Sequence, residues 1–245
     1  MTPIPAQPEA DFWAGLADPG AALGVLDRLP GAVVFVKDAR CRYVFANHTL
    51  AARLGLPDAG ALLGRTAAEV FPAPLGERYL AQDRAVLAGG GVTDLLELHL
   101  YPGGAAGWCL TTKRALGGHD GGAVGLSGIS RDVPLNPDAA PGLAGAVQHL
   151  QRDHAEPLTV ANLARLAGLS VSAFERACRR TFGLTPGQLI TRARLDAATR
   201  LLEGDLPVAR VAVEVGYFDH SAFTRAFRTA VGLTPSEYRR LRVKK

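Results

Sequence analysis

Cysteine is scarce in this sequence, with three residues among 245, and there is only one methionine. Cys41, Cys109 and Cys178 lie far apart along the chain and form no CxxC pair. This spacing excludes the disulfide framework of a small scaffold and the usual cysteine metal sites. We therefore expect reduced, mostly buried thiols in a protein that holds no metal ion.

Long hydrophobic runs are also missing. No stretch approaches the roughly 18 apolar residues that a membrane-spanning helix needs, although 48% of the residues are hydrophobic. The opening MTPIPAQPEAD has no basic start followed by an apolar core, so we expect no signal peptide. These features predict a cytoplasmic protein without membrane contact, and its length fits two domains.

Patterns that carry catalysis are absent as well. No Ser/His/Asp arrangement stands out, and the glycine run at 89–91 precedes an expected strand, whereas a phosphate-binding loop opens a helix. A DNA-repair methyltransferase would need a cysteine in a Pro-Cys-His setting or a four-cysteine metal site, and the sequence has neither. We expect that the protein is not an enzyme.

Charge changes along the chain at a proline-rich stretch. Lys and Arg outnumber Asp and Glu by 16 to 9 over residues 142–245, whereas acidic residues lead by 14 to 11 over residues 1–141. The stretch PLNPDAAPG at 134–142 has three prolines and no apolar periodicity, which is typical of a linker. The basic half is the one expected to meet a polyanion. We predict a lead segment at 1–23, a first domain at 24–133, a linker at 134–141 and a second domain at 142–245.

The second domain contains an internal repeat. FERACRRTFGLTP at 174–186 and FTRAFRTAVGLTP at 223–235 are identical at 8 of 13 positions, at an offset of 49 residues. Each copy predicts a helix, a tight glycine turn and a second helix. In the first copy we expect a helix at 160–167, capped by Thr159, a turn at Gly168, and a second helix capped by Ser170 that ends near 182. In the second copy we expect a helix at 208–215, a turn at Gly216, and a second helix after its cap Asp219.

Between the copies, residues 188–202 have the apolar pattern of one amphipathic helix. About 15 residues make a helix about 22 Å long. Such a rigid spacer can hold two recognition helices about one DNA turn apart, near 34 Å. Ala164 and Ala212 sit where the helices of each pair would cross closely, a pattern typical of DNA-binding helix-turn-helix units.

These motifs make residues 145–242 resemble the DNA-binding domain of AraC-type regulators. The resemblance rests on the first unit at 163–183, the spacer helix with Arg194, and the closing motifs GYFDHSAFTRAFR at 216–228 and GLTPSEYR at 232–239. It implies seven helices and major-groove binding by the second helix of each unit. It also implies control of transcription, usually activation, with RNA polymerase as a partner beside double-stranded DNA.

The exposed faces of the two expected recognition helices supply the candidate DNA contacts. Side chains near each helix N-terminus reach deepest into a groove and are predicted to read base edges: Ser172, Glu175, Arg176, His220, Ser221, Thr224 and Arg225. Three arginines further along are better placed for phosphates: Arg179, Arg180 and Arg228. Glu175 has a second interpretation, as the ion-pair partner of Arg179 four residues on.

The first domain has a different pattern, with short strands around a few helices. LPGAVVFVKD at 29–38, YVFAN at 43–47 and the ending GLSGISRD at 125–132 resemble the PAS family. The resemblance implies an α+β domain, a five-stranded antiparallel sheet with helices on one face, ahead of the all-α domain with its two helix-turn-helix units. The expected strands are 32–37, 42–46, 92–101, 108–116 and 123–131, and the expected helices are 48–54, one near Leu62, 67–71 and 75–87.

The PAS-like domain raises the question of a cofactor. Flavin photosensors of this family use a cysteine in the region matching 64–71, and haem proteins commonly use a histidine on the long helix, here 75–87; neither residue is present. We therefore expect no cofactor. Two interpretations stay open: the pocket between sheet and helices takes a small organic ligand, or the domain serves only to form a homodimer or to dock a partner protein.

Overall fold

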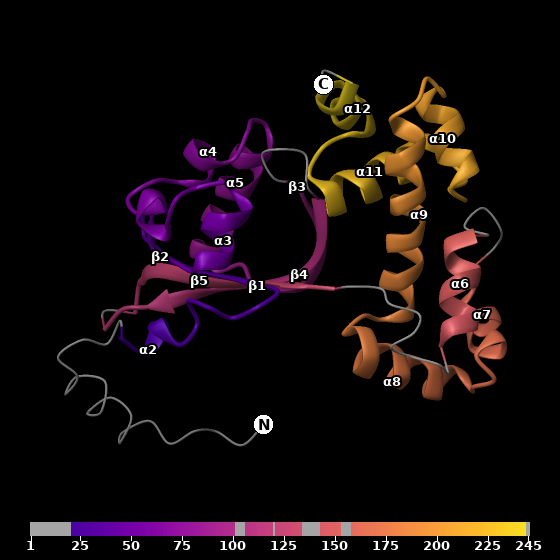
Figure 1. Cartoon of the computed structure of the whole chain (residues 1–245), viewed down its shortest axis with the longest axis horizontal. Coiled ribbons are helices and arrows are strands. Elements are labelled where there is room, and N and C mark those ends of the chain that lie inside the picture. The colour runs from indigo at the N-terminus through magenta and orange to yellow at the C-terminus, as the bar shows by residue number, and fades with distance from the viewer. Residues whose placement is uncertain (1–20, 101–105, 120, 134–142, 153–157, 244–245) are drawn as a thin grey trace.

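The computed structural model describes residues 21–100, 106–119, 121–133, 143–152 and 158–243. The predicted linker at 134–141 and most of the lead segment at 1–23 lie outside these residues. An α+β domain comes first in the chain and an all-α domain follows it, side by side in Figure 1. This is the predicted architecture.

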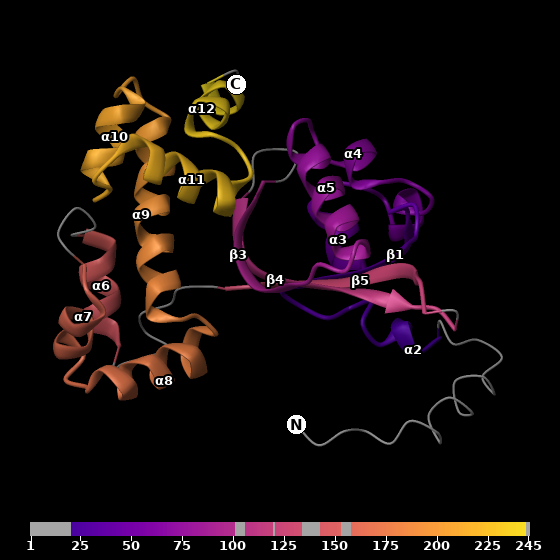
Figure 2. The same ribbon diagram turned by 180° about the vertical axis from the view of Figure 1, so that it is seen from behind.

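The first domain is built on one antiparallel sheet. Its strands β1 (Ala32–Asp38), β2 (Tyr43–Ala46), β3 (Val92–Leu100), β4 (Ala106–Gly117) and β5 (Ala123–Asp132) pair in the order β2-β1-β5-β4-β3. Helix α2 (Ala21–Gly24) precedes the sheet, and α3 (His48–Arg53), η1 (Ala59–Leu62), α4 (Ala67–Val70) and α5 (Leu75–Leu87) lie between β2 and β3 in sequence. Figures 1 and 2 show α3, α4 and α5 on one face of the sheet, as the PAS resemblance implies.

Two side chains explain why the sheet and α3 join as they do. The Asn47 side-chain oxygen accepts hydrogen bonds from the backbone of Leu50, which caps α3, and of Val34 in β1. Gly128 of β5 lies under the ring of Phe35, and a side chain there would collide with that ring. The glycine therefore allows Phe35 to lie across the inner face of the sheet.

The second domain has seven helices in the described residues, the number that the AraC resemblance implies. They are α6 (Ala144–Arg152), α7 (Val160–Leu166), α8 (Val171–Phe182), α9 (Pro186–Leu202), α10 (Val208–Glu214), α11 (His220–Val231) and α12 (Pro235–Val243). The spacer α9 begins two residues before the expected position because Thr185 and Gln188 form a capping box and Pro186 occupies the first turn. Its 17 residues span about 25 Å.

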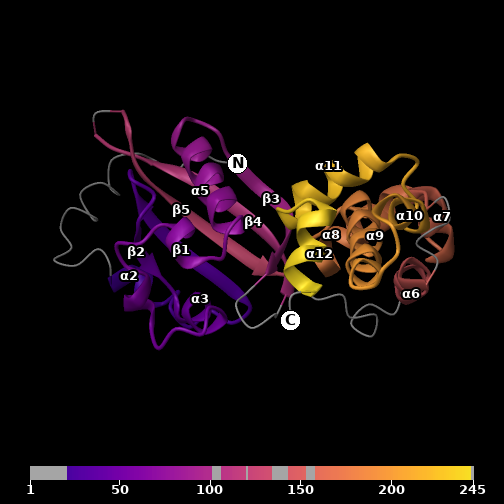
Figure 3. The same cartoon turned by 90° about the horizontal axis from the view of Figure 1, so that it is seen from above.

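The apolar core does not stop at the domain boundary. One buried cluster contains Leu96, Leu98 and Trp108 of the sheet together with helix residues such as Leu189 and Val231 of the second domain. A second cluster, with Val33, Phe35 and Leu62, belongs to the first domain alone. The view from above in Figure 3 shows α11 beside β3, and the two elements are in contact. The two domains are docked on each other through an apolar interface.

The three cysteines lie inside the fold. Cys41, Cys109 and Cys178 are buried, as predicted, and they form no disulfide with one another. Burial raises the pKa of the Cys178 thiol to about 11. Within the described ranges, no group of three or more His, Cys, Asp or Glu residues could hold a metal ion. None of the described helices is long and apolar enough to cross a membrane.

Candidate DNA interface and ligand pocket

The first helix pair, α7 and α8, forms a compact unit with one basic face. Thr159 caps α7 and Ser170 caps α8, each accepting a backbone N–H three residues on. Gly168 turns the chain at a φ of 66°, a left-handed conformation that costs a side-chain-bearing residue about 1–2 kcal/mol. Helix α8 buries Phe174 and Cys178. The opposite side leaves every predicted contact of this unit exposed: Ser172, Glu175, Arg176, Arg179 and Arg180.

The second pair, α10 and α11, repeats this arrangement. Asp219 caps α11 by accepting from the backbone of Ala222 at 2.6 Å, and Phe223 and Phe227 are buried beneath the helix. Four predicted contacts are exposed: His220, Ser221, Arg225 and Arg228. Thr224 differs, because its side chain is half-buried and its hydroxyl oxygen is covered, with no hydrogen-bond partner among the described residues.

The basic faces carry little compensating charge. Glu175 is exposed, and among the described residues it forms no ion pair with Arg179, which leaves its carboxylate available to other groups.

Arg194 of the spacer, part of the AraC resemblance, packs its guanidinium 5.5 Å from the centre of the Tyr217 ring. It therefore tethers the spacer to the turn of the second pair.

The ends of both candidate recognition helices face the first domain. The guanidinium of Arg131, at the end of β5, lies beside Gly183, the C-cap of α8. Arg78 of α5 donates to the backbone oxygen of Thr229, near the end of α11, at 2.5 Å. A cation is favourable at a helix C-terminus, where the last carbonyls carry partial negative charge. These contacts attach the C-terminal ends of α8 and α11 to the first domain.

Polar contacts accompany this docking along α9. The Trp108 indole donates to Asp196 at 2.5 Å, and its ring centre lies 5.8 Å from the Arg192 guanidinium. Arg192 also donates to the backbone oxygen of Val133, and Gln188 donates to the backbone oxygen of Asp94 at 3.0 Å. The spacer that separates the two helix pairs is therefore also the surface on which the sheet rests.

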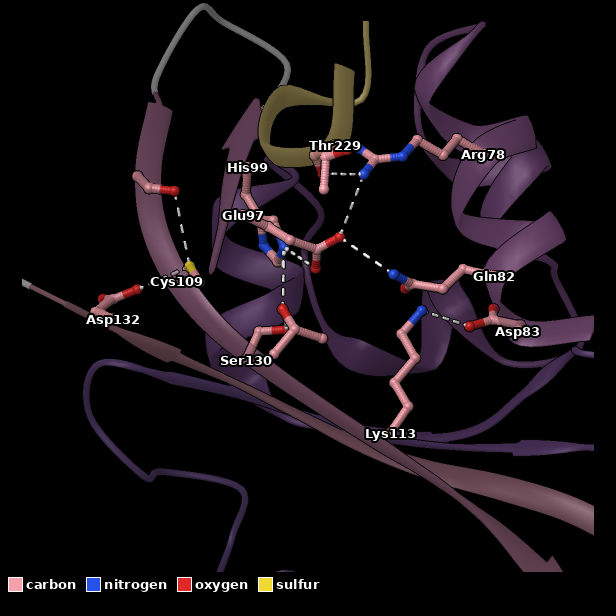
Figure 4. A network of polar contacts seen from close by, with 12 residues as sticks. Arg78, Gln82, Asp83, Glu97, His99, Cys109, Lys113, Ser130, Asp132 and Thr229 are labelled. Atoms are coloured by element: carbon pink, nitrogen blue, oxygen red, sulfur yellow. Dashed lines mark hydrogen bonds and ion pairs between the residues drawn. The ribbon is translucent and has the colours of Figure 1, made fainter. Parts of the chain in front are cut away.

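A pocket lies on the inner face of the sheet, beneath α5. Its lining surrounds about 430 Å³ of empty space, a figure that includes open solvent at its mouth. Aromatic rings form much of its wall, and Figure 4 shows the polar residues Gln82, Glu97, His99 and Lys113 that share it. The lining residues are Val33, Phe35, Lys37, Tyr43, Leu50, Phe71, Tyr79, Gln82, Glu97, His99, Thr111, Lys113 and Ser130.

Glu97 is the centre of one polar cluster in the pocket wall. It lies 3.5 Å from His99 and 3.8 Å from Arg78, and it accepts from Gln82 at 3.2 Å. Burial alone would raise the pKa of Glu97, but its hydrogen bonds to His99 and Thr111 lower that pKa to about 2. Burial would lower the pKa of His99, but hydrogen bonds with Cys109 and Glu97 raise it to about 9. At neutral pH the pair is an ion pair.

Asp83 is the centre of a second cluster. This carboxylate is fully buried and binds two ammonium groups, those of Lys37 and Lys113, the latter at 2.6 Å. Lys37 also lies 4.1 Å from the centre of the Tyr43 ring. Burial lowers the pKa of both lysines, against the opposing effect of Asp83.

Sequence reasoning did not single out these pocket residues. The alternation in β3 predicts one buried face, yet both faces are covered: Leu96 and Leu98 meet the second domain, while Glu97 and His99 face the pocket. A usable signal was present in β1, because Lys37 lies in register with the inward-facing Val33 and Phe35. A lysine in phase with apolar residues points to a buried polar site.

Comparisons with known proteins agree with both domains. A helix-turn-helix domain model matches residues 163–241 and a PAS fold model matches residues 26–134. An AraC-like transcription regulator of Streptomyces lividans is 31% identical over 175 residues, which cover 70% of this chain and 48% of that protein. Another from Streptomyces antibioticus is 39% identical over 103 residues, covering 42% of this chain and 34% of that protein. The chain thus spans half or less of the length of these relatives.

The C-terminal domain of AraT, a response regulator from Geobacillus stearothermophilus, is 30% identical, with a TM-score of 0.41, over 42% of this chain and 88% of that one. On the evidence of the two domain models and the similar sequences, residues 26–134 form a PAS domain and residues 163–241 a helix-turn-helix domain like that of AraC-like transcription regulators.

Proposed function

We propose that the protein regulates transcription by binding specific DNA sites in the cytoplasm, with α8 and α11 as recognition helices in adjacent major grooves. The observation that carries the proposal is the pair of equivalent, capped helix units on one spacer, each with an exposed basic face. The spacer of about 25 Å separates the two units, and successive major grooves on one side of the duplex lie ~34 Å apart.

The proposed contacts follow position along each helix. Residues in the first turns read base edges, with Arg176 and Arg225 each able to make two hydrogen bonds to a guanine. Glu175 accepts from a cytosine, and Ser172, His220 and Ser221 supply weaker polar contacts. Arg179, Arg180 and Arg228 bind phosphates. Thr224 contributes its methyl group rather than its covered hydroxyl.

The PAS domain is proposed to modulate this activity. A small ligand in the pocket changes the surroundings of Glu97, and Arg78 connects that residue with the end of α11. The response is a shift in how the domains dock, which changes how the end of α11 is held. Activation through contact with RNA polymerase is the output that the family resemblance favours.

The two-helix proposal is tested by selecting DNA sites for the full chain from a random pool and comparing variants on the selected site. Arg176→Ala and Arg225→Ala are each expected to cost about 1–3 kcal/mol and to relax preference at one base pair. The two relaxed base pairs should lie about one DNA turn apart, ~10 base pairs. Arg200→Ala is the matched control, because it removes an exposed arginine from the spacer.

Relaxation at the same base pair by both variants, or no relaxation by either, would refute two-groove recognition. A full chain that binds no sequence preferentially would refute the function itself. The alternative role of the PAS domain, homodimerisation or protein docking alone, would appear as DNA binding that no pocket substitution and no small molecule changes.

A further inference from the structure

The pocket of the PAS domain has an unusual balance of buried charge. Two cations, Lys37 and Lys113, share the single carboxylate of Asp83. Two more, Arg78 and His99, flank the single carboxylate of Glu97. The ion pairs that the described residues form around the pocket therefore comprise four cations and two carboxylates.

An excess of buried positive charge is costly, because a low-dielectric interior stabilises a charge poorly unless an opposite charge accompanies it. Lys37 obtains part of that stabilisation from the Tyr43 ring. Lys113 lies farther from an aromatic face, 5.7 Å from the Phe35 ring centre, and Asp83 is its one hydrogen-bond acceptor among the described residues. An ammonium group has three donors, so Lys113 can still bind an anion.

A second group with an unused hydrogen-bonding atom lines the same pocket, on α5. The side-chain nitrogen of Gln82 donates to Glu97, which fixes the orientation of the amide. Its side-chain oxygen is buried and has no hydrogen-bond partner within the described part of the chain. A buried acceptor without a donor is rare in folded proteins. The pocket thus offers a donor for an anion on β4 and an acceptor for a hydroxyl group on α5.

The remaining wall is apolar and aromatic. Phe35, Phe71 and Tyr79 line the pocket, with the Phe71 and Tyr79 rings packed edge to face at 5.0 Å. We propose that the pocket binds a small hydroxy carboxylic acid. Its carboxylate accepts from Lys113, its hydroxyl donates to the Gln82 oxygen, and its apolar body lies against these rings. The assignment rests on the proposed function, because this acid would be the ligand that modulates DNA binding.

The test uses the full chain and four probes of similar shape, measured by calorimetry at neutral pH. Mandelate carries the carboxylate, the hydroxyl and a ring; mandelamide lacks the charge; phenylacetate lacks the hydroxyl; benzylamine carries the opposite charge. We expect mandelate to bind at least about tenfold more tightly than mandelamide. Phenylacetate should lie between them, and benzylamine should show no binding.

Two substitutions should change mandelate affinity in opposite directions, whereas a merely structural effect would weaken binding in both variants. Lys113→Met removes the anion contact and should abolish the preference for mandelate over mandelamide. Glu97→Gln removes a negative charge and should strengthen mandelate binding. If Lys113→Met does not fold, the probe series on the unaltered chain and the Glu97→Gln result decide the question.

The results also separate this assignment from the proposed function. Equal or tighter binding of mandelamide or benzylamine, weaker mandelate binding by Glu97→Gln, or no binding of any probe would overturn the ligand class. In each of these cases a selected DNA site that the chain still binds leaves the regulator intact. Failure of the chain to bind any DNA sequence preferentially, with mandelate still bound, would overturn the regulator and leave the ligand class standing.

Discussion

Removal of Arg78 should loosen the docking of the DNA-binding domain without unfolding either domain. Its guanidinium donates to the Thr229 carbonyl at 2.5 Å and lies 3.8 Å from Glu97. A hydrogen bond from a charged donor contributes about 1.5–3 kcal/mol, and a cation at a helix C-terminus about 0.3–1 kcal/mol more. The side chain is 24% exposed, so solvent weakens both effects. We expect Arg78→Ala to cost about 2 kcal/mol of docking free energy.

A loss of that size changes the ratio of docked to undocked molecules about 30-fold. The apolar contacts of Leu96 and Leu98 remain, so docking weakens but persists. Hydrogen exchange of the backbone amides in the last turn of α11 measures the effect, because these amides exchange faster when the end of the helix is released. The protection of the central strands β5 and β1 should stay unchanged.

Arg84→Ala is the matched control. Arg84 lies on the same helix, is exposed, and forms no hydrogen bond or ion pair with α11 among the described residues. Gln188→Ala provides an intermediate case, since it removes a neutral hydrogen bond to the Asp94 carbonyl, with an expected cost of about 1 kcal/mol of docking free energy. It also removes the Gln188 half of the α9 capping box, which affects the helix start rather than the docking. Equal exchange rates in Arg78→Ala and Arg84→Ala would refute the role of Arg78 at the interface.

Three further outcomes are expected. The affinity of the full chain for its selected site should fall linearly on a log–log plot against salt concentration, with a slope of several units if about 5–8 phosphates are contacted. Arg180→Ala should reduce that slope by about one, which fluorescence anisotropy can measure. An unchanged slope would contradict the phosphate contact of Arg180. Gly168→Ala should destabilise the protein by about 1 kcal/mol in urea unfolding, because φ there is 66° while no atom lies within 4 Å of the added methyl group; no loss would mean that the turn relaxes. The free energy of unfolding should fall as pH rises from 6.5 towards about 9, because the pKa of His99 is raised in the folded state. Protonated His99 contributes its full stabilisation only below its pKa in the unfolded chain. His99→Gln should flatten this part of the pH profile, and an unchanged profile would exclude His99 as its source.

The sequence by itself determined the local elements and their order. The repeat at 174–186 and 223–235 predicted two helix pairs, and the caps at Thr159, Ser170 and Asp219 are where the structure has them. Capping, glycine turns and apolar periodicity act over a few residues, so they can be recognised in the sequence before any tertiary contact is known. The order of short strands and helices likewise predicted the antiparallel sheet.

The exposure of the polar faces of α8 and α11 was predictable for the same reason. A helix that buries Phe174 and Cys178 must turn Arg176 and Arg179 outward, because residues three and four apart share a face. Thr224 shows the limit of this argument. Its position on the helix predicted exposure, but neighbouring side chains cover its hydroxyl oxygen.

Only the tertiary structure decided how the two domains meet and what the pocket contains. Arg78 and Thr229 are 151 residues apart, and Lys37 and Lys113 reach one carboxylate from different strands. Periodicity indicates that a strand face is buried, but it does not say whether solvent, a ligand or another domain covers the opposite face. Here the outer face of β3 is covered by the DNA-binding domain and its polar face lines the pocket, because the edge of the sheet rests on α9 and α11.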